Sequence, residues 1–88
     1  MKKPFREWFT NDYLMKVNLS SQLVSGNRQI ALRQERICVV AETIIAHPKM
    51  SMEELRKQIS IELFVTMRSA LDYINHAKML IDKWEKAN

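Results

Sequence analysis

The stretches SMEELRKQISI, residues 51–61, and VTMRSALDYI, residues 65–74, decide the fold expected for this 88-residue chain. The first begins with a capping box, a pattern typical of a helix N-terminus. In that pattern the Ser51 hydroxyl accepts a hydrogen bond from the backbone at Glu54, and the Glu54 side chain reaches back. We therefore expect a helix to begin directly after Ser51.

Apolar side chains recur at helical spacing through both stretches. The first helix has an apolar edge over two turns, formed by Met52, Leu55 and Ile59. That pattern breaks at Ser60-Ile61-Glu62. Beyond the break, apolar residues step by three and four and predict a second, longer helix: Phe64, Met67, Leu71 and Ile74. This helix either continues through Trp84 or leaves as an extended strand at residues 79–81.

A third helix is expected upstream, over residues 28–46. Its apolar side chains fall on one wide face. His47-Pro48 ends it, because the residue before a proline disfavours helical backbone. Before this helix, Ser25-Gly26-Asn27 contains the only glycine of the chain and breaks regular structure. Residues 15–19 alternate apolar with polar side chains, which fits a short strand or a helical turn.

Composition limits the chain to one mostly α-helical domain. It has 47% hydrophobic and 27% charged residues, with one glycine and two prolines. A domain of this size leaves much of its surface exposed, which favours a dimer. Cys38 is the only cysteine and cannot form an internal disulfide, as is typical of a cytoplasmic chain. We expect no targeting segment and no membrane span.

The net charge is +4, and the excess lies in the first part of the chain. Residues 1–49 hold eight Lys and Arg against four Asp and Glu, whereas residues 50–88 are balanced at six of each. A small basic protein favours a polyanionic partner, either nucleic acid or an anionic membrane surface.

Residues 51–74 and the helix before them resemble the helix-turn-helix of winged-helix proteins. In that family a capped short helix with an internal leucine is followed by a tight turn and a helix that packs back onto it. Here Leu55, Ile59 and Ile61 correspond to the apolar residues of the first helix and the turn. Met67, Leu71 and Ile74 correspond to those of the second helix. The resemblance covers residues 30–81. Residues 77–81 correspond to the exit into a strand, and only residues 82–88 follow, which implies a reduced or absent wing.

The resemblance implies that the second helix enters the major groove of duplex DNA. Its base-reading candidates are Thr66, Arg68, Ser69, Asp72 and Tyr73. Arg68 is the strongest of these, because a guanidinium group can pair with guanine through two hydrogen bonds. The candidates for phosphate contacts are Lys49, Arg56, Lys57, Arg28, Arg33 and Arg36.

Aromatic residues gather near the N-terminus. Phe5, Trp8 and Phe9 stand at helical spacing in residues 4–9, which predicts a short helix, and residues 10–12 predict a turn after it. With the basic residues around them they could lie on an anionic membrane, or they could dock on the core. We favour a dimer contact made by these three side chains together with Ile81 and Trp84.

The sequence gives no support for catalysis. It has two histidines and one cysteine, at scattered positions, and it has no glycine-rich phosphate loop. We therefore expect no catalytic residue, no cofactor and no metal site.

These patterns together predict one domain, residues 1–88. It consists of an N-terminal extension (1–27), a helix-turn-helix core (28–81) and a C-terminal tail (82–88). The expected function is sequence-specific binding of double-stranded DNA as a homodimer, in transcriptional regulation or as a centromere-binding protein in plasmid partition. A second protein component is a further candidate partner. The alternative is a helical protein-interaction module, such as an antitoxin or adaptor. A ribbon-helix-helix with residues 15–19 as its strand fits poorly, because the break at residues 25–27 separates that strand from a long helix.

Overall fold

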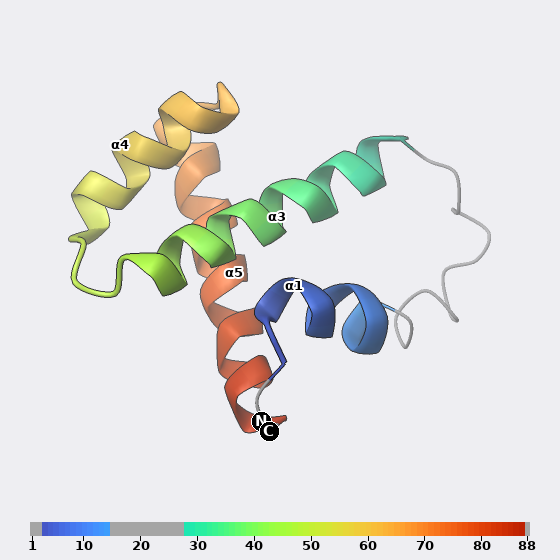
Figure 1. Ribbon diagram of the computed structural model, residues 1–88. Coiled ribbons are helices and arrows are strands. Elements are labelled where there is room, and N and C mark those ends of the chain that lie inside the picture. Colours follow the sequence, from blue (N-terminus) through green and yellow to red (C-terminus); the bar gives the residue numbers. More distant parts are fainter. Residues whose placement is uncertain (1–2, 15–27, 88) are drawn as a thin grey trace.

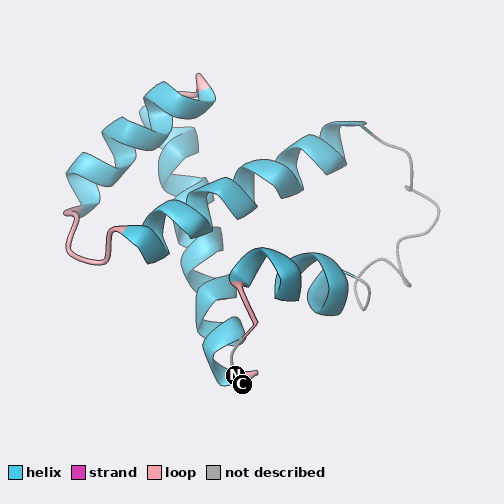
Figure 2. Ribbon diagram, in the orientation of Figure 1, coloured by secondary structure: helices cyan, strands magenta, loops and turns pink. Residues whose placement is uncertain are grey.

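The computed structural model describes residues 3–14 and 28–87, and all regular structure in these ranges is helical (Figure 2). The elements, in chain order, are α1 (Phe5–Glu7), the π-helical segment η1 (Trp8–Tyr13), α3 (Arg28–Ala46), α4 (Met52–Leu63) and α5 (Met67–Lys86). This confirms a mostly α fold. The patterns at residues 15–19 and 25–27 lie outside the described residues. Within the described ranges, no helix combines the length and the apolar composition needed to cross a bilayer.

One apolar stripe along α5 organises the fold. Ala70, Ile74, Ala77, Leu80 and Trp84 follow one another at steps of four, three, three and four residues, and all are buried. These steps place the five side chains on one helix face. Helix α3 crosses α5 along its middle, and α4 packs beside its first half (Figure 1).

Helix α5 does not give way to a strand. Residues 79–81 are helical, because the stripe continues through Leu80 and Trp84 and carries the helix to Lys86. The expected strand exit is therefore wrong, and residues 82–86 belong to α5 rather than to a separate tail.

The boundaries of α3 and the start of α4 agree with the sequence patterns. Helix α3 ends at Ala46, immediately before His47-Pro48. At the start of α4, the Ser51 hydroxyl accepts a hydrogen bond from the Glu54 backbone N–H at 3.2 Å. This confirms half of the capping box. The reciprocal bond from the Glu54 side chain does not form among the described residues.

The turn between α4 and α5 lies later than the sequence suggests. Residues 60–62 are helical, and the turn consists of residues 64–66. The Ser60 carbonyl accepts a hydrogen bond from Val65 N at 3.1 Å, and the Ser60 hydroxyl donates to the Val65 carbonyl at 2.6 Å. These bonds satisfy groups at the C-terminus of α4 that a helix leaves without partners. Phe64 was expected on the apolar face of the second helix, but it lies in this turn.

Phe64 occupies the left-handed backbone region, with φ 54° and ψ 47°. This region usually belongs to glycine at a helix C-terminus, because a Cβ atom crowds the neighbouring carbonyl there. The Phe64 side chain is 95% exposed, so it recovers almost no burial energy within the chain. The turn is therefore closed at the expense of backbone strain.

Phe64→Gly is expected to stabilise the protein by about 1 kcal/mol, because glycine removes the Cβ from a left-handed position. Urea denaturation measures the effect. Phe64→Ala is the matched control, since it removes the same ring but retains Cβ, and it should leave stability near that of the wild type. Equal stability of the Gly and Ala variants would show that the backbone at Phe64 is not strained.

Segments α1 and η1 together form the N-terminal helix, whose aromatic side chains pack into the core of their own chain. Phe5, Trp8 and Phe9 are 3%, 7% and 3% exposed, and the Phe5 ring meets the Trp84 ring edge-on at 5.8 Å. The Trp84 indole N–H also donates to the Lys3 carbonyl at 2.8 Å. These four side chains are thus not available for the expected dimer contact, and the fifth, Ile81, is half-buried against the same core. The aromatic side chains pack on the core of their own chain, which was the alternative hypothesis.

The predicted turn at residues 10–12 is also wrong, because η1 runs through them. Aromatic packing on both sides accounts for the continuation. The Tyr13 ring stacks on Phe9 at 5.8 Å and lies 5.5 Å from Trp8, so the helix must extend to bring Tyr13 back to these rings. This packing outweighs the turn preference of Asn11 and Asp12.

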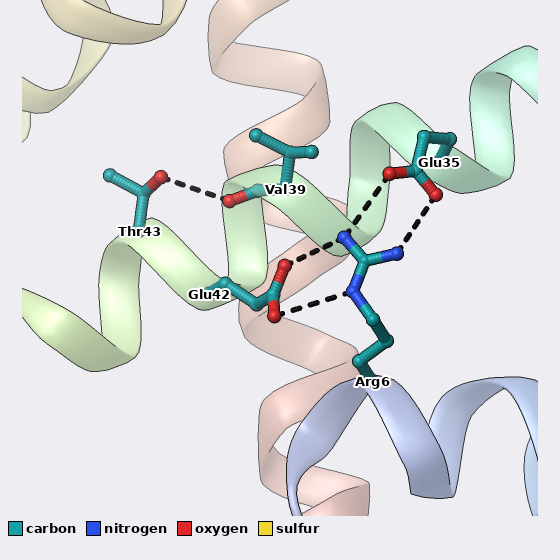
Figure 3. Close-up of polar contacts among 5 residues, drawn as sticks. All are labelled: Arg6, Glu35, Val39, Glu42 and Thr43. Atoms are coloured by element: carbon teal, nitrogen blue, oxygen red, sulfur yellow. Dashed lines mark hydrogen bonds and ion pairs between the residues drawn. The ribbon is translucent and has the colours of Figure 1, made fainter.

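Arg6 ties the N-terminal helix to α3. Its guanidinium group lies between Glu35 and Glu42, two turns apart on one face of α3, and donates two hydrogen bonds to each carboxylate (Figure 3). The shortest ion-pair distances are 3.0 Å to Glu35 and 2.8 Å to Glu42. The bonds to Arg6 lower the pKa of Glu35, and the bonds to Glu42 and Glu35 raise the pKa of Arg6. All three side chains are about half exposed, so solvent weakens the pairing.

Glu35→Gln is expected to destabilise the protein by less than about 1 kcal/mol at pH 7, a limit set by solvent exposure of the pair. Because the folded-state pKa of Glu35 is lowered, its contribution is present above the ordinary value of 4.5 and is lost as pH falls through the folded-state pKa. The two proteins should therefore converge in stability below pH 4.5 in urea titrations. Glu7→Gln, an exposed residue of α1 without a described ion pair, is the control and should match the wild type at every pH.

Candidate nucleic-acid interface

The base-reading candidates lie at the N-cap and on the first two turns of α5, but they do not form one free surface. Thr66, Arg68 and Asp72 are exposed, whereas Ser69 and Tyr73 are half-buried. The Thr66 hydroxyl accepts the Ser69 backbone N–H at 3.1 Å and so caps the helix. This leaves Arg68 and Asp72 as the predicted residues whose polar groups have no partner in the described part of the chain.

Tyr73 faces α3 and holds two of its arginines. The Arg33 guanidinium carbon lies 5.6 Å from the centre of the Tyr73 ring, and Arg36 Nη1 donates to the Tyr73 hydroxyl at 3.4 Å. The first contact is a cation–π interaction, and the second is a long hydrogen bond. The Tyr73 side chain therefore contacts two arginines of α3 and is not free to contact a base.

The charges of α3 are separated onto two faces. Glu35 and Glu42 turn toward the N-terminal helix, where Arg6 binds both (Figure 3). Arg33 and Arg36 turn toward Tyr73 on α5. Neither arginine forms an ion pair within residues 3–14 and 28–87.

Two further residues of α5, which the sequence analysis did not select, are linked to Arg33 through electrostatic interactions. His76 follows Tyr73 by one helical turn and is half-buried. Burial lowers its pKa, and the positive charges of Arg33 and Lys83 lower it further. Lys83 lies two turns beyond His76, with its ammonium group 5.7 Å from the centre of the Tyr13 ring. We define the α3–α5 cation cluster as Arg33, Arg36, His76 and Lys83.

The remaining phosphate candidates differ in availability. Lys49 is exposed in the turn between α3 and α4 and forms no described ion pair. Lys57 is exposed and lies 3.8 Å from Glu53 on the same helix. Arg56 is half-buried, and its Nε atom is buried without a hydrogen-bond partner in the described residues. Arg28 begins α3, but its side chain lies outside the described residues.

Asn75 is a further candidate for base contacts. It is exposed, and it follows Arg68 by seven residues and Asp72 by three, so the three share one face of α5. An asparagine amide can pair with adenine through two hydrogen bonds. The same helical spacing in the sequence identifies this residue, provided that the helix is known to start at Met67 and to continue beyond it.

The chemistry available to Cys38 is limited. The side chain is 2% exposed, and burial raises the pKa of its thiol to about 11. The thiol therefore remains protonated near neutral pH, and the thiolate needed for nucleophilic attack is scarce. In the described ranges, no group of three or more His, Cys, Asp and Glu side chains could hold a metal ion.

No protein-family description, no curated protein and no solved structure shows significant similarity to this chain. Its function must therefore be inferred from its own residues.

His76 should make stability depend on pH. Its folded-state pKa is lowered, so the unfolded chain binds the proton more readily, and stability is lost as pH falls from the ordinary value of 6.5 through the folded-state pKa. His76→Gln should remove this loss, which urea denaturation at a series of pH values measures. His47→Gln changes an exposed imidazole and serves as the control. If stability depends on pH in the same way in His76→Gln as in the wild type, His76 is not the group responsible.

Proposed function

We propose that α3, α4 and α5 form a helix-turn-helix that binds duplex DNA, with the exposed face of α5 in the major groove. The arrangement supports this proposal in three respects. A capped helix of 12 residues is followed by a short turn and by a capped helix of 20 residues. The two helices pack on each other and on α3. The second helix presents Arg68, Asp72 and Asn75 to solvent near its start.

The proposal depends above all on the cations that the fold leaves without carboxylates. Lys3, Arg6, Lys57 and Lys86 each pair with an acidic side chain. The cations without a described ion pair include most of the predicted DNA contacts: Arg33, Arg36, Lys49, Arg56 and Arg68. Such cations can release the counterions of a phosphate backbone on binding without first breaking an ion pair.

In this mechanism the two kinds of contact have separate roles. Lysine and arginine contacts to phosphate provide affinity for any sequence and position the protein on the duplex. Arg68 pairs with the O6 and N7 atoms of guanine, and Asn75 pairs with adenine. We propose that such sequence-specific binding serves transcriptional regulation or plasmid partition.

A second candidate is a protein-interaction module. Phe64 is 95% exposed and Ile61 is 73% exposed, three residues apart at the end of α4. An aromatic residue held in a strained backbone conformation and turned to solvent favours a role in contact with a partner. Association through these apolar side chains would change little with salt, whereas binding to DNA phosphates must weaken steeply.

Arg68→Ala is expected to weaken binding to a selected duplex by about 1–3 kcal/mol and to relax the preference at one base pair. Lys49→Ala should weaken binding to all sequences alike and reduce the salt dependence by about one phosphate contact. Fluorescence anisotropy with selected and random duplexes, at about 50 and 200 mM salt, measures both effects.

The control is Lys86→Ala, which removes an exposed cation at the end of α5 that is paired with Asp82, and it should bind like the wild type. If the wild-type protein binds no duplex at the lower salt concentration, the proposed function is wrong. If Arg68→Ala and Lys49→Ala have the same effect on every sequence, DNA binding stands but the base-reading role of Arg68 does not.

A further inference from the structure

The α3–α5 cation cluster has the features of an oxyanion site. Two guanidinium groups, from positions three residues apart on α3, meet on Tyr73, at 5.6 Å from its ring and 3.4 Å from its hydroxyl. The ammonium group of Lys83 is held against the Tyr13 ring. Aromatic rings fix the positions of these cations without neutralising them, which a carboxylate would do.

His76 lies within the electric field of this cluster. It is half-buried on the same side of α5, and the charges of Arg33 and Lys83 both act to lower its pKa. An anion bound between the cations would reverse this effect, because a nearby negative charge favours the protonated imidazole.

We propose that the α3–α5 cation cluster binds a phosphate group, and that His76 takes up one proton from solvent when the phosphate binds. The planar fork of a guanidinium group matches two phosphate oxygens, and a protonated imidazole adds a third donor. Phosphate binding and His76 protonation therefore strengthen each other. The inference rests on the proposed function where the phosphate is part of a DNA backbone; a small phosphate compound is the other source of the same chemistry.

Several other titratable groups belong to the cluster, to the rings that contact its cations or to the preceding turn of α5. From α3 they are Arg33 and Arg36, from α5 they are Asp72, Tyr73 and Lys83, and from η1 the group is Tyr13. Near neutral pH, His76 is the group in this set whose ordinary pKa allows a change of charge. Proton uptake between pH 5 and 8 is thus assigned to His76.

The test is a pH titration of both imidazoles by NMR, for the protein alone, with a selected duplex and with pyrophosphate. The pKa of His76 is expected to rise when the phosphate binds. The rise should be lost in the Arg33→Gln/Arg36→Gln variant and retained in Lys78→Gln.

Affinity provides a second readout. Since one proton is taken up, duplex binding should tighten as pH falls, by at most about tenfold per pH unit. His76→Gln should abolish this proton-linked component, and comparison with Lys78→Gln at each pH separates it from a general charge effect.

The outcomes separate the inference from the proposed function. Salt-dependent duplex binding with an unchanged His76 titration overturns the inference and leaves DNA binding intact. A His76 shift with pyrophosphate but no duplex binding supports the phosphate site and overturns the proposed function. If neither compound moves His76 and no duplex binds, both are wrong.

Discussion

Burial of one face of α5 is the constraint on which the other elements depend. Its stripe of five buried side chains meets α3 and α4, and Trp84 at its end meets the Phe5 ring of the N-terminal helix. Ala70 and Ala77 are fully buried, and such small side chains let neighbouring helices approach closely. Helix α5 packs against α3, α4 and the N-terminal helix along its 20 residues. It therefore continues past residues 79–81, where a strand was expected.

The same packing determines which charged side chains of α3 form ion pairs. Docking of the N-terminal helix brings Arg6 between Glu35 and Glu42, and this uses the acidic side chains of α3. Arg33 and Arg36 remain on the opposite side, supported by an aromatic ring instead of an acid. A short aromatic segment, expected to join two copies of the chain, thus sets the electrostatics of the candidate interface.

The turn between α4 and α5 shows the limit of reading periodicity alone. The apolar step from Phe64 to Met67 is correct helical spacing, yet the backbone leaves the helix at Phe64 with positive φ. Two hydrogen bonds between Ser60 and Val65 close the turn, one donated by each residue, and no sequence pattern indicates them. Asn75 went unselected for a related reason, since its place beside Arg68 is defined only once the helix start at Met67 is known.

Local signals in the sequence are enough to place the helices that carry clear caps and breaks. The bounds of α3 follow from its periodicity and from His47-Pro48, and the start of α4 follows from the Ser51 cap, because caps and prolines act over a few neighbouring residues. Arg68 was also identified as an exposed cation on the second of the paired helices. Three features appear only when the helices pack together. The N-terminal aromatic residues are buried in the core, Tyr73 contacts two arginines, and the charge of Arg33 acts on His76. These outcomes depend on contacts between residues as many as 81 positions apart, which no local pattern encodes.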